Sequence, residues 1–222
     1  MMSAQRRSPI HDDLEHLHAK WGVIHEMPVA LSFAASETER NIAQKLGLAD
    51  VSALKRVTYK GARAGAWLSQ QGIAVPAEIY GVERLDGGAL CARTGAAEFF
   101  IEDGPSSRIV EKLESAPGAN TDGVYRVLRQ DASFLISGEK TAHVLSETCG
   151  YDFSRHESKI VYTRVAGVSC SILRNTVSGL PVYQLWLDNT YGPWLWHTLL
   201  EIVTDLGGSP VGLSVFYPGL TA

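Results

Sequence analysis

The sequence is poor in the features that mark special classes of protein. It has three cysteines, Cys91, Cys149 and Cys170, an odd number spread widely along 222 residues. This argues against a disulfide framework and favours a reducing compartment, which we take to be the cytoplasm. No apolar run approaches the ~18 residues of a membrane helix. The first residues, MMSAQRRSPIHDD, have no apolar segment behind their two arginines, so they predict no secretory signal.

Charge and nucleotide motifs are also missing. With 24 acidic and 20 basic residues the formal net charge is −4, and no run of Lys or Arg is interleaved with aromatic residues. Nucleic acid is therefore not an expected partner. Neither G-x-G-x-x-G nor G-x-x-x-x-G-K-[ST] occurs, so the chain predicts no nucleotide cradle of its own. C-x-x-C and H-E-x-x-H are absent as well.

The remaining chemical candidates are weak, and we predict no metal site and no catalytic residue. Of the N-terminal histidines, His11 and His18 could share a helical face, but His16 does not match it and a fourth ligand is missing. Gly167–Cys170 lacks the second glycine of a nucleophile elbow and favours a core strand. Cys149, at the C-terminal end of a predicted helix, is expected to be inert. We expect a solvated strand edge for the acidic residues Glu98, Glu102 and Asp103.

A long internal repeat organises the chain. Ser133–Ser137 predicts a strand that Gly138 ends, followed by a short helix, and Val57–Lys60 with Gly61 repeats this pattern. Strands are then predicted at Leu90–Arg93 and Glu98–Glu102, and in the second copy at Lys159–Arg174 and Val182–Asp188. The closing helices are predicted at Ser106–Leu113 and Tyr191–Val203. The sequence therefore predicts an α+β fold made of two pseudo-repeated strand–helix–strand–strand–helix halves.

The length fits one domain built from two halves, at about 8–116 and 124–213, joined by the loop 117–123. Residues 1–12 predict an N-terminal arm. Leu14–Trp21 has helical spacing, and Glu26–Phe33 is interpreted as extended. Ser36 is the expected N-cap of a helix to Leu46, with Glu39 at the capping-box position.

The last predicted helix is apolar on nearly every face. Trp194 and Trp196 lie about 200° apart on a helix of ~100° per residue, so they point in nearly opposite directions. One face must pack on the chain's own sheet, and the other needs a second cover. The cover could be the N-terminal segment around Trp21 or a neighbouring subunit. Trp21, Trp194 and Trp196 are therefore the interface candidates.

Several short motifs, in order, resemble the glycine-cleavage T-protein family. They are Ser8-Pro9-Ile10-His11, the acidic segment Glu37–Ala43, Gly47–Ser52, and Lys60-Gly61. The later part, SGEKTAHVLSETCGYDF with Val182–Leu185 and Tyr191–Leu200, is more similar still to the gamma subunit of heterotetrameric sarcosine oxidase. The resemblance covers most of residues 8–213 and implies a folate-binding aminomethyltransferase-like fold. It places Leu54, Tyr183 and Gln184 on the folate side.

The chain departs from this pattern where the family carries its chemistry. The family's loop aspartate is missing from Ile79–Leu85, and its pterin-binding glutamate corresponds to Gln184. A carboxylate accepts two hydrogen bonds from a pterin edge, whereas an amide offers one acceptor and a competing donor. No counterpart of the family's C-terminal barrel domain is expected in this chain.

The resemblance therefore implies a non-catalytic, gamma-type subunit of a heteromeric flavin- and folate-dependent N-demethylating oxidase or dehydrogenase. Its flavin is expected on partner subunits, and tetrahydrofolate is possible on this chain. One alternative is an autonomous tetrahydrofolate-dependent aminomethyl- or methyltransferase. Another is a non-enzymatic folate-binding module.

Overall fold

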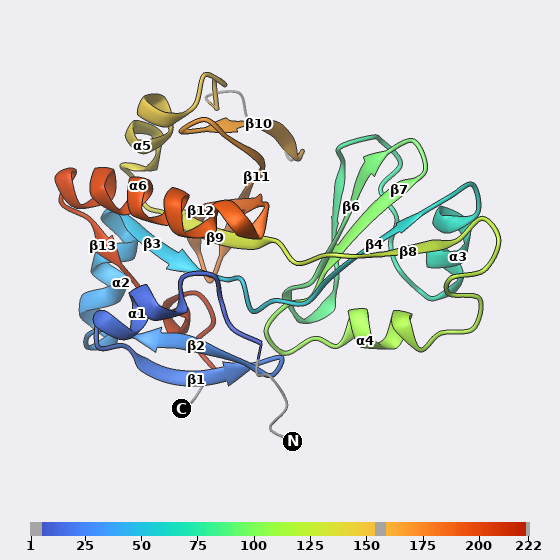
Figure 1. Ribbon diagram of the computed structural model, residues 1–222, viewed down its shortest axis with the longest axis horizontal. Coiled ribbons are helices and arrows are strands. Elements are labelled where there is room, and N and C mark those ends of the chain that lie inside the picture. The colour runs from blue at the N-terminus through green and yellow to red at the C-terminus, as the bar shows by residue number, and fades with distance from the viewer. Residues whose placement is uncertain (1–5, 154–158, 221–222) are drawn as a thin grey trace. The chain divides into compact units, whose positions relative to one another are not determined.

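A computed structural model describes residues 6–153 and 159–220 (Figure 1). The chain divides into two compact units, each assembled from separate stretches of sequence. Unit 1 comprises residues 1–53, 131–157 and 161–222, and unit 2 comprises residues 54–130 and 158–160. The expected halves, 8–116 and 124–213, do not coincide with these units, because the chain crosses between them at 53/54 and 130/131. That the whole chain forms one domain stays a prediction.

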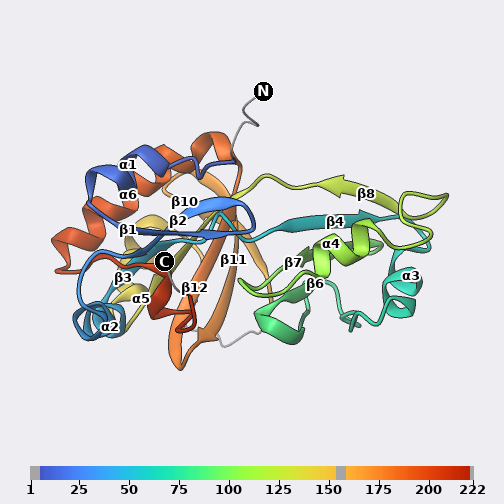
Figure 2. The same ribbon diagram turned by 90° about the horizontal axis from the view of Figure 1, so that it is seen from below.

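Unit 2 is a five-stranded antiparallel sheet in the order β5-β6-β7-β4-β8. Its helices α3 and α4 (Figure 2) pack on one face. In that core the ring centroids of Tyr59 and Trp67 lie 4.8 Å apart. Its elements are β4 (Arg56–Lys60), α3 (Ala64–Gln70), β5 (Val82–Arg84), η1 (Asp86–Gly88), β6 (Leu90–Gly95), β7 (Glu98–Glu102), α4 (Ile109–Glu114) and β8 (Tyr125–Leu128).

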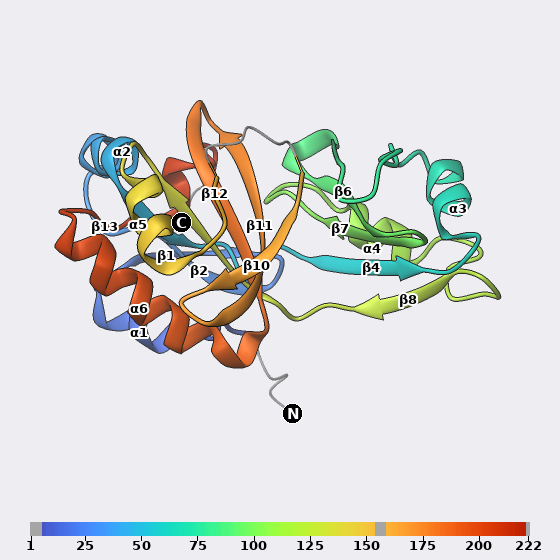
Figure 3. The same ribbon diagram turned by 90° about the horizontal axis from the view of Figure 1, so that it is seen from above.

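Unit 1 is built on a six-stranded sheet in the order β10-β11-β12-β9-β3-β13, with α5 and α6 contributing to the core on one face (Figure 3). Its elements in the sheet region are β3 (Gly47–Asp50), β9 (Ala132–Ser137), α5 (Thr141–Thr148), β10 (Val161–Val165), β11 (Val168–Val177), β12 (Leu180–Leu187), η2 (Asn189–Tyr191), α6 (Gly192–Asp205), β13 (Ser209–Pro210) and η3 (Leu213–Val215). The N-terminal part adds α1 (His11–His16), the hairpin β1 (Lys20–Ile24) and β2 (Met27–Ser32), and α2 (Ser36–Lys45).

The predicted repeat is confirmed by strand order. Replacing β5, β6, β7 and β4 of unit 2 by β10, β11, β12 and β9 gives the first four positions of the unit 1 sheet, and every one of these pairings is antiparallel. The fifth position differs in chain order: β8 follows the last helix of its unit, whereas β3 precedes the rest of its sheet. The fifth strand therefore comes from the segment after the repeated module in unit 2 and from the segment before it in unit 1.

The two glycines that mark the repeat are required by the backbone. Gly61 and Gly138 have φ of +122° and +98°, where residues with a Cβ are strained. A Cβ on Gly61 would lie 2.5 Å from the carbonyl oxygen of Gly123, and one on Gly138 2.5 Å from the carbonyl carbon of Lys45. Each glycine lets another segment approach the strand end closely.

Two predicted elements need correction. Lys159–Arg174 is a hairpin rather than one strand, because Ala166 and Gly167 have φ of 46° and 85° and turn β10 into β11. Leu14–Trp21 is not one helix: α1 ends at His16 and Trp21 belongs to β1. Leu14 and Trp21 pack on the same core from different elements, and this gives their apolar side chains the apparent spacing of one helix.

The predicted capping box at the N-terminus of α2 is wrong. The N-cap is Ala35, and no side chain caps this end. Glu39 is instead buried, and its Oε1 accepts hydrogen bonds from the backbone N–H groups of Phe33 at 3.0 Å and Gly212 at 2.9 Å. This carboxylate therefore joins the β2–α2 connection to the C-terminal segment rather than forming a capping box.

The part of the expected arm that the structure describes is built into unit 1. Ile10 is fully buried and α1 already begins at His11, whereas residues 1–5 lie outside the described part of the chain. Among the described residues, no helix combines the length and apolar character needed to cross a membrane.

Candidate functional site

A buried polar network crosses the centre of the unit 1 sheet at Gln184. The Gln184 side chain is 3% exposed, and its Nε2 donates to Ser133 Oγ at 3.3 Å. The backbone N–H of Ser133 donates to Ser52 Oγ at 3.0 Å, and the N–H of Ser52 donates to Asp50 Oδ1 at 2.9 Å. Three segments, β12, β9 and the residues after β3, are thus joined by hydrogen bonds among buried groups, which rigidify a site when satisfied.

Tyr183 does not join this network. Adjacent residues of a strand point to opposite faces, and Tyr183 packs on the helix-covered core. Its ring meets Phe153 edge-on at 5.4 Å, and the guanidinium of Arg174 lies 6.0 Å from the ring centroid. Leu54, the third folate-side candidate, is buried in unit 2. The structure therefore does not gather Leu54, Tyr183 and Gln184 on one face of one unit, and their role in folate binding stays a prediction.

The three interface candidates separate clearly by exposure. Trp196 is 1% exposed and packs against Phe134, with ring centroids 5.3 Å apart. Trp21 is half-buried, and its ring lies 4.7 Å from that of His11. Trp194 is 51% exposed. The core of unit 1 thus covers Trp196, which leaves Trp194 as the candidate with a largely exposed ring.

Glu102, the last residue of β7, and Asp103, which follows it, are buried, whereas Glu98 at the start of β7 is partly exposed. The expected solvated edge is therefore wrong for Glu102 and Asp103. The Arg56 Nε lies 2.5 Å from Glu102 Oε2, and their side chains are 1% and 3% exposed. Asp103 Oδ1 accepts from Ser107 Oγ at 2.5 Å and from the backbone N–H of Ile109 at 2.8 Å. β7 is an interior strand with neighbours on both sides, so Glu102 at its end is paired instead of solvated.

Two of the three thiols are deeply buried. Burial raises the pKa of Cys91 and of Cys170 to about 12, so neither forms a thiolate nucleophile near neutral pH. Cys170 belongs to the hydrophobic core of unit 1, which confirms the core strand predicted for Gly167–Cys170. Cys149 is a buried free cysteine at the C-cap of α5.

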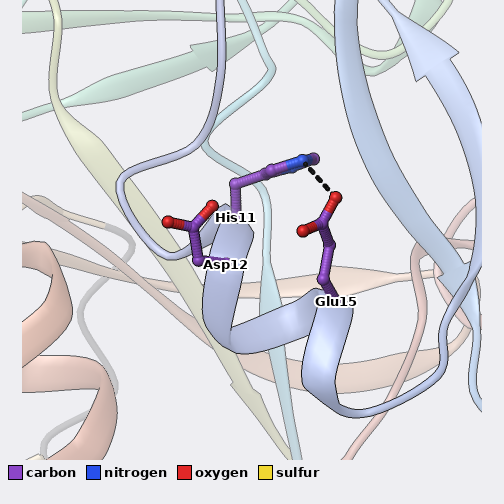
Figure 4. A group of neighbouring side chains, drawn as sticks. All are labelled: His11, Asp12 and Glu15. Carbon is purple, nitrogen blue, oxygen red and sulfur yellow. Dashed lines mark ion pairs between the residues drawn. The ribbon is translucent and has the colours of Figure 1, made fainter.

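One group of possible metal ligands lies on α1 (Figure 4). Ligand atoms of His11, Asp12 and Glu15 fall within 4.8 Å of one another, and His11 Nε2 lies 3.2 Å from Glu15 Oε1. This proximity is the i,i+4 pairing usual on helices. Asp12 and Glu15 are exposed, and we assign no metal here. His18 lies beyond the end of α1 with φ of 56°, so it does not extend the group along a helical face.

Comparison with known proteins identifies the fold. No family model matches the chain. An aminomethyltransferase of Caldanaerobacter subterraneus subsp. tengcongensis is 28% identical over 103 residues, which are 42% of this chain and 27% of that protein. An aminomethyltransferase of Thermoanaerobacter sp. (strain X514) is 24% identical over 208 residues, 84% of this chain and 55% of that protein. The chain therefore spans only part of the curated relatives it matches.

Two solved structures resemble the whole chain. The glycine cleavage system aminomethyltransferase T from Bartonella henselae has a TM-score of 0.73 at 16% identity, covering 96% of this chain and 61% of that one. A chain of the heterotetrameric sarcosine oxidase from Corynebacterium sp. U-96, in complex with pyrrole 2-carboxylate, has a TM-score of 0.64 at 15% identity. That match covers 93% of this chain and 98% of the other. The chain has a T-protein-like fold. The predicted fold class is thereby confirmed.

Proposed function

We propose that this chain is a non-catalytic subunit of a hetero-oligomeric, sarcosine-oxidase-like oxidase or dehydrogenase that removes N-methyl groups. The observation that carries the proposal is the extent of the structural matches. The chain and a chain of the heterotetrameric enzyme coincide over 93% and 98% of their lengths, whereas 61% of the aminomethyltransferase T is covered. In this assembly, partner subunits hold the flavin and oxidise the amine, and the one-carbon unit passes to tetrahydrofolate.

The chemistry of Gln184 supports a role without pterin catalysis. In the family that the chain resembles, the corresponding residue is a glutamate, and both of its carboxylate oxygens can accept hydrogen bonds from a pterin edge. Gln184 presents a neutral amide, and its Nε2 is already a donor to Ser133 Oγ at 3.3 Å. The residues of this network do not fit the charged mode of pterin binding. The segment Ile79–Leu85 likewise offers Glu83, on the exposed strand β5, and no aspartate.

The first prediction is that the isolated chain binds a tetrahydrofolate analogue weakly. Losing a charged hydrogen bond costs about 1.5–3 kcal/mol, which weakens a micromolar site about tenfold to a hundredfold. Calorimetric titration with 5-formyltetrahydrofolate should give no saturation below about 100 μM. The matched variant is Gln184→Glu, which restores the carboxylate at the same position. Micromolar binding by the unaltered chain would contradict the proposal.

The second prediction concerns assembly. A chain tagged in its native host should purify in a fixed ratio with flavin-containing polypeptides, and the complex should oxidise an N-methyl amine. Obligate interfaces commonly bury more than about 2,000 Å², so the complex should survive gel filtration at nanomolar concentration. A host-derived chain that elutes as a monomer, free of flavoprotein, would overturn the subunit proposal.

The alternative is an autonomous folate-dependent aminomethyl- or methyltransferase, which the curated sequence matches favour because both reported relatives are named aminomethyltransferases. The same two experiments separate the alternatives. A transferase requires tight folate binding and no flavoprotein partner, whereas the proposed subunit requires the opposite pair of results.

A further inference from the structure

A cavity of about 550 Å³ lies in unit 2, where the loop after α3, the β5–η1 turn and the start of α4 meet. Pockets for small molecules are commonly about 300–1,000 Å³. Three lining side chains are cationic, Arg84, Arg108 and Lys112, and one, Asp86, is acidic. The whole chain has 20 basic and 24 acidic residues. The lining of the cavity therefore has an excess of basic residues, whereas the chain as a whole has an excess of acidic ones.

The protein neutralises two of these cations, Arg108 and Lys112, only in part. Arg108 Nη1 lies 3.0 Å from Glu111 Oε2, but their side chains are 77% and 55% exposed, so solvent screens the pair strongly. Lys112 Nζ donates to the carbonyl oxygen of Gln71 at 3.5 Å, and this partner carries no charge. Both cations thus keep positive charge to offer a ligand.

The positive charge comes from side chains and not from the helix end. The backbone N–H groups of Ile109 and Val110, in the first turn of α4, already donate to the carboxylate of Asp103. Arg108 and Lys112 are four residues apart and therefore lie on one face of the helical turn. Both residues line the cavity, as does Arg84 at the end of β5.

Close backbone contacts fix the walls. A Cβ on Gly104 would overlap the carbonyl oxygen of Gly87, and a Cβ on Gly87 would lie 3.1 Å from Ser107 Cβ. Gly87 also has φ of +69°, which favours glycine. The η1 turn is thereby held against the segment that leads into α4. The cavity is formed by the fold itself and needs no ligand to shape it.

We propose that this cavity binds a small anion with two or more negative charges, of the phosphate or dicarboxylate class. Guanidinium groups present paired N–H donors that match the oxygens of both classes, and the lysine ammonium adds a point charge. The site goes beyond the proposed subunit role and does not depend on it, because all its residues belong to unit 2 of this chain.

Calorimetric titration of the full chain with inorganic phosphate, pyrophosphate and succinate tests the proposal, in a buffer of low chloride. The variants are Arg108→Gln and Lys112→Gln. The matched control is Arg63→Gln, because Arg63 is also an exposed arginine of unit 2 paired with one carboxylate, that of Asp122, but does not line the cavity. Thermal unfolding without ligand verifies that all three variants fold.

We expect saturable binding of at least one probe with a Kd below about 1 mM, weakened about tenfold or more by each cavity variant and less than twofold by Arg63→Gln. Preference for pyrophosphate over succinate identifies a phosphate ligand, and the reverse a dicarboxylate. No saturation up to about 10 mM for any probe, or equal weakening by Arg63→Gln, overturns the proposal. These titrations do not measure association with flavoproteins. The anion site and the subunit role can therefore be contradicted independently of each other.

Discussion

Replacing Glu102 by leucine is expected to lower the free energy of unfolding by about 3–5 kcal/mol, because it leaves the guanidinium of Arg56 buried without this carboxylate. The Nε–Oε2 distance is 2.5 Å, and both side chains are almost completely buried. The buried guanidinium has no access to water that could replace the lost carboxylate. Urea unfolding followed by tryptophan fluorescence measures the change.

The same two strands supply the control. Lys60 and Glu98 are partners at the other end of the β4–β7 ladder, with Nζ and Oε2 3.2 Å apart and side chains 47% and 31% exposed. Replacing Glu98 by leucine should change stability by no more than about 1 kcal/mol. The double variant Arg56→Met with Glu102→Leu should recover much of the loss, since it removes both charges. Equal costs for Glu102→Leu and Glu98→Leu would show that burial does not set the energy.

The repeat could be predicted from the sequence because its signals are local. A β-branched strand closed by glycine precedes an apolar helix at both Gly61 and Gly138, and both glycines adopt backbone conformations that other residues avoid. What local patterns could not show is which sequence segment completes each sheet. β3, at Gly47–Asp50, pairs with β9 much later in the chain: Ala49 lies opposite Leu135, 86 positions away. Such a pairing leaves no mark in a window of neighbouring residues.

The same limit explains the mistaken environments. Glu39, Glu102 and Asp103 look like surface residues in the sequence, because charged residues are mostly exposed. Glu39 and Glu102 have partners far away in the sequence: Gly212 is 173 positions from Glu39, and Arg56 is 46 from Glu102. The carboxylate of Asp103 is buried against nearer groups, Ser107 and the first turn of α4. The Gln184 network has the same character, since Ser133 is 51 positions away. Polar partners distant in sequence were the information that residue patterns lacked.

Two tryptophans of α6, two residues apart, are expected to give opposite results on substitution. Trp196→Ala should cost about 3–5 kcal/mol of unfolding free energy, because it empties a large volume in the core of unit 1 beside Phe134. Trp196→Phe should cost much less, about 1.5 kcal/mol or below. It keeps most of the ring volume and removes the indole N–H, for which no hydrogen-bond partner is found among the described residues.

Trp194→Ala should leave the stability of the isolated chain within about 0.5 kcal/mol of its original value, because the ring is 51% exposed and surface substitutions cost little. If this ring is an anchor for a partner subunit, the same change should weaken assembly by about 2 kcal/mol or more, the usual effect of removing an interfacial tryptophan. Denaturant unfolding gives the first quantity, and the concentration at which the host-derived complex dissociates gives the second. Tyr191, also exposed near the start of α6 at 55%, provides the neighbouring control as Tyr191→Ala. If the complex dissociates at the same concentration with and without the Trp194 ring, this residue is not part of the interface. If Trp196→Ala leaves the free energy of unfolding unchanged, the core packing described for Trp196 is wrong.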